Sequence, residues 1–276
     1  MISLSLLERA KFLLREYRIF PKKRLGQNFM VEGSLFPCLA DYALLGKSDM
    51  VLDVGVGFGF LSRFLAERCR RVLAVELDSR IVKVLREQLV GVANVDVIEG
   101  DVLRVQVPSF NKVVSVPPYQ ISSSLLLWLF ERQFDCAVLV FQREFVNRLV
   151  ASVGDVDYGW LAVVAYYYVD VEVLDDVPRW MFFPRPEVDS VVVRLKPKRS
   201  FPFVLKDVVM FRRLVQLMFA RRNRKVRNAV LPSVKCIDNI SLECAAEVVD
   251  RFPFRDRRVR ELAPEDFGVL ANALVG

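Results

Sequence analysis

The chain has 276 residues, of which 53% are apolar, and its formal net charge is +7. This length predicts one large domain with a small one, and no stretch of about eighteen uncharged apolar residues is present that could span a membrane. The complete absence of histidine excludes imidazole bases and histidine metal ligands, and five scattered cysteines without Cys-x-x-Cys spacing indicate a reduced, intracellular protein without a cysteine-based metal site.

The N-terminal third begins with two predicted helices separated by a basic loop. Apolar residues recur at helical spacing over residues 4–17, and residues 31–46 have a similar pattern. Between them, residues 21–30 place a basic cluster before a glycine and two amides. Its apolar residues predict that this loop packs against the rest of the protein. The first residues lack the basic and apolar regions of a secretory signal, so we expect no signal peptide.

A glycine-rich turn organises the sequence that follows. Residues 51–54 read as a buried strand, glycines occupy positions 55, 57 and 59, and residues 61–67 read as an amphipathic helix. Alternate glycines let a backbone approach a ligand closely, since no Cβ intervenes. The third glycine of a dinucleotide fingerprint would stand at position 60, which is Phe60 here. The alternative to a ligand-binding turn is an ordinary tight turn between strand and helix. Asp53, at the end of the strand, is placed to receive a cation.

Three further strands support a nucleoside ligand. Residues 72–75 end in Glu76, which is placed to hold two ribose hydroxyls, and residues 95–98 lead to Asp101, which can accept from an adenine amine. Residues 112–115 lead into Pro117, Pro118 and Tyr119. Because parallel strands bring their carboxyl ends to one edge of a sheet, we expect an α/β fold with these residues along one ligand-binding edge.

The remaining elements follow from the same patterns. We predict that residues 158–169 and 171–174 are apolar β-rich segments, and that the two prolines of residues 182–190 make a stiff turn. Residues 196–202 break the pattern as a linker, which predicts domains over 1–197 and 198–276. The other predicted helices are 79–89, 122–132, 142–153 and 208–219, and the other predicted strands are 136–141 and 191–195.

Charge is distributed unevenly between the two predicted domains. Residues 198–260 hold 16 Lys and Arg against 6 Asp and Glu, a net charge of +10, so the rest of the chain sums to −3. Such a basic region is typical of a protein with a polyanionic partner. A solvated helix is the alternative, but phosphate contact explains the density of charge better. The cations at its centre are Arg221, Arg222, Arg224, Lys225 and Arg227.

Together these motifs resemble the KsgA-like ribosomal RNA adenine dimethyltransferase family, and more closely its archaeal and eukaryotic branch. The resemblance covers nearly the whole chain. The motifs that carry it, in the order in which the family has them, are Arg24-Leu-Gly-Gln-Asn-Phe-Met30, the glycine turn, Glu76, Asp101, Pro118-Tyr119-Gln-Ile-Ser-Ser123, Phe182-Phe-Pro-Arg-Pro-Glu-Val-Asp-Ser190 and the arginine-rich run at 219–228.

The resemblance implies a class I methyltransferase domain over 1–197 and a small, basic, helical RNA-binding domain over 198–276. It implies S-adenosylmethionine as cofactor and two adjacent adenines of small-subunit ribosomal RNA as targets, modified by a cytoplasmic monomer during ribosome biogenesis. Tyr119 is then expected to stack on the flipped base, with Phe182 enclosing it beside Val116, Pro117 and Pro118. The implied cofactor residues are Gln27, Asn28, Met30, Asp53, Gly55, Gly57, Glu76, Leu77, Asp101, Val102 and Ser115.

One position departs from the family pattern. The family has Asn-Leu-Pro-Tyr or a close variant, whereas this chain has Val116 where the amine-binding Asn is expected. A valine side chain accepts no hydrogen bond, and losing one positioned hydrogen bond of this kind costs roughly 10²–10³ in rate. The sequence therefore leaves open a slowed methyltransferase, a ribosome-assembly factor that hardly catalyses, and an enzyme directed at DNA.

Overall fold

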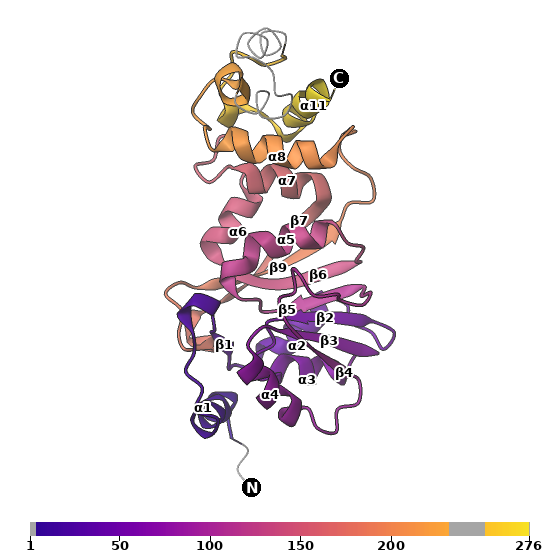
Figure 1. Cartoon of the computed structure of the whole chain (residues 1–276), viewed down its shortest axis with the longest axis vertical. Helices are drawn as coiled ribbons and strands as arrows, with labels where there is room; N and C mark the ends of the chain where they lie inside the picture. Colours follow the sequence, from indigo (N-terminus) through magenta and orange to yellow (C-terminus); the bar gives the residue numbers. More distant parts are fainter. Residues whose placement is uncertain (1–3, 232–251, 276) are drawn as a thin grey trace. The chain divides into compact units, whose positions relative to one another are not determined.

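The computed structural model describes residues 4–231 and 252–275 (Figure 1). The chain divides into two compact units, the first made of residues 1–146 and 171–197 and the second of residues 147–170 and 198–276. The predicted boundary after residue 197 is thus one point where the chain passes between units. Residues 147–170, which the sequence placed with the first domain, belong to the second unit instead.

The first unit is built on a seven-stranded sheet in the order β4-β3-β2-β5-β6-β9-β7 (Figure 1). The strands from β4 to β6 are parallel, and β9 runs antiparallel to β6. This confirms the predicted α/β class. The strands are β2 (Met50–Val54), β3 (Arg71–Glu76), β4 (Val95–Glu99), β5 (Lys112–Ser115), β6 (Cys136–Gln142), β7 (Val169–Val177) and β9 (Ser190–Pro197).

The direction of winding reverses at β2. From β2 the chain moves to β3 and β4 on one side, and then returns to place β5 and β6 on the other. Two loops therefore leave the carboxyl ends of adjacent strands β2 and β5 in opposite directions. Such a switch point opens a crevice at the sheet edge, which is where open α/β sheets bind ligands.

Helices cover the sheet through one large apolar core. Leu39 of α2 and Leu65 of α3 are fully buried and pack in one cluster with Val51, Val72 and Val114 of the strands. Strands buried on both faces read as continuous apolar runs, which is why the sequence revealed them. The helices of this unit are α1 (Leu6–Glu16), α2 (Leu35–Tyr42), α3 (Phe60–Ala66), α4 (Ser79–Gln88) and α5 (Ser122–Phe130), and α6 (Arg143–Val150) spans the division between the units at residue 146. None of the helices in the described ranges is long and apolar enough to cross a membrane.

A small second sheet joins two motifs that are distant in the sequence. β1 (Phe29–Met30) pairs antiparallel with β8 (Phe182–Phe183), and the amide of Val31 donates to the carbonyl of Met181 at 2.8 Å. The first strand belongs to the N-terminal basic loop and the second begins the proline-rich segment, which was expected to be only a turn. This pairing brings both segments to the same edge of the large sheet as the glycine turn.

The second unit is helical where it is described, and it corrects one prediction. Residues 160–168 form helix α7 (Trp160–Tyr168) rather than a β-rich segment, and only the following β7 is a strand. Most of α7 is buried, and it packs against α8 (Val208–Phe219) and α11 (Pro264–Leu274). A helix that is apolar on every face shows no amphipathic period, so its β-branched and aromatic residues suggested a strand.

Candidate functional site

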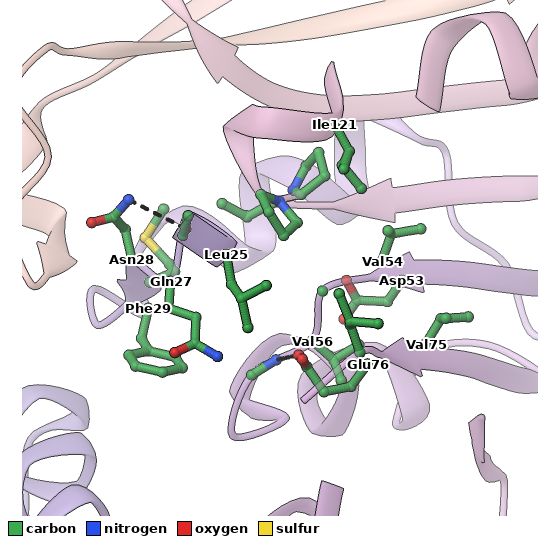
Figure 2. Close-up of a pocket in the computed structure, with 18 of the residues that line it drawn as sticks. Leu25, Gln27, Asn28, Phe29, Asp53, Val54, Val56, Val75, Glu76 and Ile121 are labelled. Atoms are coloured by element: carbon green, nitrogen blue, oxygen red, sulfur yellow. Dashed lines mark hydrogen bonds between the residues drawn. The ribbon is translucent and has the colours of Figure 1, made fainter. Parts of the chain in front are cut away.

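A cavity lies at the carboxyl ends of β2, β3 and β5, at the switch point of the sheet. Figure 2 shows Asp53 and Glu76 on one side of it and Leu25, Gln27 and Asn28 of the N-terminal loop on the other. The cavity thus collects all four strand ends that the sequence singled out. The predicted residues that line it are Gln27, Asn28, Met30, Asp53, Gly55, Gly57, Glu76, Leu77, Asp101, Val102, Val116, Pro117, Pro118, Tyr119 and Phe182.

Ser115 is the one predicted cofactor residue that does not line the cavity. Its side chain is fully buried, and its hydroxyl accepts from the amide of Val54 and donates to the carbonyl of the same residue, both at 2.9 Å. Its position one residue before Val116 points it to the other side of β5. Ser115 therefore joins β2 to β5, and the geometry does not support the predicted cofactor contact.

Sequence reasoning missed several lining residues that are apolar or belong to the basic loop. Leu25 and Phe29 reach the cavity from the N-terminal loop, and Phe58 reaches it from the glycine turn. Phe29 stacks on Phe58 with ring centroids 4.5 Å apart. The apolar residues of the loop were the available signal, since they predicted packing without indicating against which partner. The other missed residues include Arg24, Gly26, Phe36, Gln120 and Ile121.

The glycine turn is shaped by the two loops that pack against it. Gly55 and Gly57 have φ angles of 69° and 55°, in the left-handed region. A Cβ on Gly55 would lie 2.4 Å from Cδ of Pro118, and one on Gly57 would lie 2.8 Å from Cδ1 of Phe29. Only glycine both adopts these angles and leaves room for the two loops. The turn thereby admits the loops that close the cavity.

The carboxylate of Glu76 is held by backbone amides. Its Oε2 accepts from the amide of Gly57 at 3.0 Å, and its Oε1 accepts from the amide of Asp78 at 2.9 Å. Burial raises the pKa of Glu76, and these two hydrogen bonds oppose that shift. Each oxygen of this carboxylate keeps a second lone pair, so Glu76 can still accept hydrogen bonds from a pair of ligand hydroxyls.

Asp53 is a second buried carboxyl, at the end of β2. It is 2% exposed, and the hydroxyl of Ser62 donates to its Oδ2 at 2.7 Å. Burial raises the pKa of Asp53 to about 7, and the bond from Ser62 counteracts part of this rise. A carboxyl with this pKa is easily ionised when a cationic group binds beside it, because a nearby positive charge favours the charged form.

The N-terminal loop is fastened over the cavity by Asp78, the N-cap of α4. Nε2 of Gln27 donates to Oδ2 of Asp78 at 3.0 Å, and Nζ of Lys22 lies 3.6 Å from the same oxygen. The guanidinium of Arg80 binds Asp78 as well and holds the pKa of its carboxyl well below the usual range. Asp78 therefore remains an ionised anchor. Within the loop, Asn28 donates to the carbonyl of Gly26 at 3.3 Å.

Tyr119 and Phe182 form an aromatic surface in the wall of the cavity. The hydroxyl of Tyr119 lies 2.7 Å from Oγ of Ser190, which is fully buried at the start of β9. The ring of Phe182 meets that of Tyr119 edge to face, with centroids 6.3 Å apart. Burial raises the pKa of Tyr119 to about 12, so the phenol stays neutral at physiological pH. Both contacts fix the orientation of the Tyr119 ring.

The predicted RNA-binding cations lie in the second unit, directly after α8. Arg221, Arg224 and Lys225 are exposed, as is Arg227, while Arg222 is half-buried. Lys225 and Arg227 both approach Asp256, at 3.2 and 3.3 Å. Arg222 donates from Nη1 to the carbonyl of Val156 at 3.0 Å. The run therefore mixes structural contacts with charge that faces solvent.

The sheet order and the cavity with its two strand-end acids define a class I methyltransferase. The profile of the family described as "Ribosomal RNA adenine dimethylase" matches residues 21–238. The chain therefore belongs to the ribosomal RNA adenine dimethylase family, as its motifs predicted. Its methyl donor is S-adenosylmethionine. The cavity offers such a donor three strand-end carboxylates, because Asp53, Glu76 and Asp101 all line it.

Relatives named as small-subunit methyltransferases resemble the chain over nearly its full length. "Probable ribosomal RNA small subunit methyltransferase A" of Methanosarcina barkeri is 37% identical over 95% of this chain and 91% of the relative. Its namesake in Pyrococcus abyssi is 35% identical over 94% of each chain. These archaeal relatives agree with the archaeal and eukaryotic branch that the motifs indicated.

Two solved structures match the fold of this protein over most of its length. A dimethyladenosine transferase from Plasmodium falciparum matches with a TM-score of 0.73 and 26% identity, covering 88% of this chain and 95% of the other. The 23S rRNA methyltransferase ErmE matches with a TM-score of 0.62 and 26% identity, covering 90% of this chain and all of the other. The predicted fold class is confirmed.

We expect Glu76→Ala to weaken binding of S-adenosylmethionine by an order of magnitude or more, because hydrogen bonds to a charged group contribute roughly 1.5–3 kcal/mol. Isothermal titration calorimetry measures the change. Glu99→Ala is the matched control, since Glu99 pairs in register with Glu76 but does not line the cavity. Equal affinity in the two variants would contradict the assignment of Glu76.

We expect Asp53→Asn to become progressively more stable than the wild type as pH rises from about 4 to about 7. The folded carboxyl retains its proton up to a pKa of about 7, against an ordinary value of 3.8, so the wild type loses folding free energy through this range. The gain in folding free energy of the variant relative to the wild type reaches at most about 4 kcal/mol and stays constant above pH 7. Thermal unfolding at several pH values measures it. Asp41→Asn, at an exposed position, is the matched control.

Proposed function

We propose that this protein transfers methyl groups from S-adenosylmethionine to the N6 atoms of two adjacent adenines near the 3′ end of small-subunit ribosomal RNA. The observation that carries the proposal is the cavity itself. In it, the nucleoside-binding ends of β2 and β3 meet the Val116–Tyr119 segment that follows β5. The family match and the named relatives support the choice of an RNA adenine as acceptor.

The chain's own residues position both reactants. S-adenosylmethionine, when bound, supplies a methyl group on a sulfonium that an amine can attack. Tyr119, fixed by Ser190 and Phe182, offers a flat ring on which an adenine taken out of its stack can lie. The carbonyl of Pro117 is the acceptor for the N6 amine. No group with a pKa near neutrality is needed there as a base, which agrees with a chain without histidine.

Val116 determines how well the amine is polarised. It lines the cavity and is half-buried against the large apolar core. Its side chain gives packing but no hydrogen bond, so the amine has one protein acceptor fewer than the family pattern provides. We therefore propose an enzyme that works with reduced turnover, acting as a cytoplasmic monomer on immature small subunits.

The reading of the chain as a non-catalytic assembly factor has less support. It rests on Val116 alone, whereas the relatives that match the chain over nearly its full length are named as methyltransferases. Transfer of tritiated methyl groups to immature small subunits tests the proposal directly. Incorporation into adenines of the small-subunit RNA is expected, and none above background would contradict it. Incorporation into DNA of the same sequence instead would favour a DNA-directed enzyme.

We expect Val116→Asn to raise turnover and leave affinity for S-adenosylmethionine nearly unchanged. The added side-chain acceptor faces the amine of the target base, and one positioned hydrogen bond of this kind is worth roughly 10²–10³ in rate. Single-turnover methyl transfer measures the gain. Val116→Ala is the control and should change little, because neither residue accepts a hydrogen bond. A wild type as fast as the Asn variant would show that the Pro117 carbonyl suffices.

We expect charge reversal at Arg221 and Arg224 to weaken binding of matched and mismatched RNA alike. Phosphate contacts carry no sequence information, and each one lost lowers the slope of log K against log salt by about 0.7–0.9. Fluorescence anisotropy at several salt concentrations measures the slope. Arg221→Lys with Arg224→Lys is the control, since it keeps the charge. An unchanged slope in the reversed variant would mean that these arginines are only solvated.

A further inference from the structure

A second cationic segment lies in the first unit, directly before the residues of the N-terminal loop that line the cavity. Residues 18–24, the lip strip, contain Arg18, Lys22, Lys23 and Arg24 and no acidic residue. Among these cations stands Phe20, whose side chain is 78% exposed. Exposed cations on both sides of an exposed aromatic ring are the combination with which proteins bind single-stranded nucleic acid, since the ring stacks on a base and the cations meet phosphates.

Most of this charge is not used within the protein. Lys22 lies 3.6 Å from Asp78, but Arg18, Lys23 and Arg24 form no ion pair with any residue in the described ranges. The nearest acidic residues along the chain are Glu16 and Glu32, on either side of the strip. These three charges are therefore available to an anionic partner.

Hydrogen bonds and a buried side chain anchor the lip strip to its neighbours, so its charges and ring are presented together. Ile19 is 4% exposed, and its amide donates to the carbonyl of Leu14 at 2.8 Å. The amide of Lys22 donates to Oε1 of Gln27 at 2.8 Å. A ligand that binds such a strip loses less free energy to ordering than it would on a mobile loop.

The strip ends at the place where a target base would enter. Arg24 lines the cavity together with Tyr119 and Gln120. Nε2 of Gln120 donates to the carbonyl of Lys23 at 3.0 Å, which ties the strip to the residue after Tyr119. An adenine stacked on Tyr119 must leave its neighbours outside the cavity. The neighbours' phosphates and bases then lie at its mouth, beside the strip.

We propose that the lip strip binds single-stranded RNA next to the target adenine, with Arg18, Lys23 and Arg24 at phosphates and Phe20 stacked on a flanking base. This surface belongs to the first unit and is separate from the Arg221–Arg227 run, and it rests on the proposed function for the identity of the strand. An acidic protein surface would satisfy the charges but would gain nothing specific from the exposed ring of Phe20.

The test is binding of a single-stranded oligoribonucleotide that contains two adjacent adenines, measured by fluorescence anisotropy with the full chain. Reversing Arg18 and Lys23 together should weaken binding at least tenfold and lower the salt slope by about 1.4, the value for two phosphate contacts on a single strand. Phe20→Ala should weaken binding about tenfold and leave the slope unchanged, because stacking involves no counterion release.

Matched controls separate this surface from general effects of charge and size. Reversing Lys83 and Arg70, which are exposed in the same unit and do not line the cavity, makes the same change in net charge. Phe12→Ala removes another exposed ring, 56% exposed on α1. Both controls should bind the oligonucleotide nearly as the wild type does. Unchanged melting temperature and S-adenosylmethionine affinity in the lip variants establish that they are folded.

Two results would overturn the proposal. Lip variants that bind RNA as the control variants do would show that the strip is not an RNA surface, whatever the methyl-transfer activity. Loss of binding on charge reversal with no effect of Phe20→Ala would reduce the strip to nonspecific charge. Methyl transfer by the wild type is assayed separately, so a failure of the proposed function appears there and leaves the binding result intact.

Discussion

Gly55 and Gly57 adopt left-handed backbone angles, and a Cβ on either would collide with the loop beside it. The contact at Gly55 is with Pro118, which precedes the aromatic wall, and the contact at Gly57 is with Phe29, which belongs to the N-terminal loop. The cavity exists in this form because two loops from distant parts of the sequence can approach the turn after β2. A side chain at either position would push the neighbouring loop away from the turn.

The same turn sets the electrostatics of the site. Its amide at Gly57 donates to Glu76, and the buried Asp53 lies at the end of the strand from which it starts. Two carboxyls in a water-poor crevice are costly when ionised without partners, and their raised pKa values express that cost. The fixed amides and the hydroxyl of Ser62 offset part of it. A ligand with hydroxyls and a positive charge would offset more of it.

Positive charge lies on each of the two units. The Arg221–Arg227 run is in the second unit, and the lip strip is beside the cavity in the first. Contact with RNA backbone at more than one place would hold a substrate whose target base must be taken out of its stack, a step that costs a few kcal/mol. In the proposed reaction the base would meet aromatic packing and one carbonyl, with Val116 contributing shape rather than polarity.

The sequence by itself determined the parallel strands, the strand-end acids and the family, because buried strands are continuous apolar runs and glycine turns are local signals. It also identified Val116 as a departure, since that depends only on residue type. Tertiary structure alone decided that β1 pairs with β8, that Ser115 ties β2 to β5, and that Leu25 and Phe29 line the cavity. It also made a helix of α7, whose apolar residues on every face leave no amphipathic signal. Each of these outcomes depends on contacts between segments far apart in the chain, and no local pattern of residues encodes such a contact.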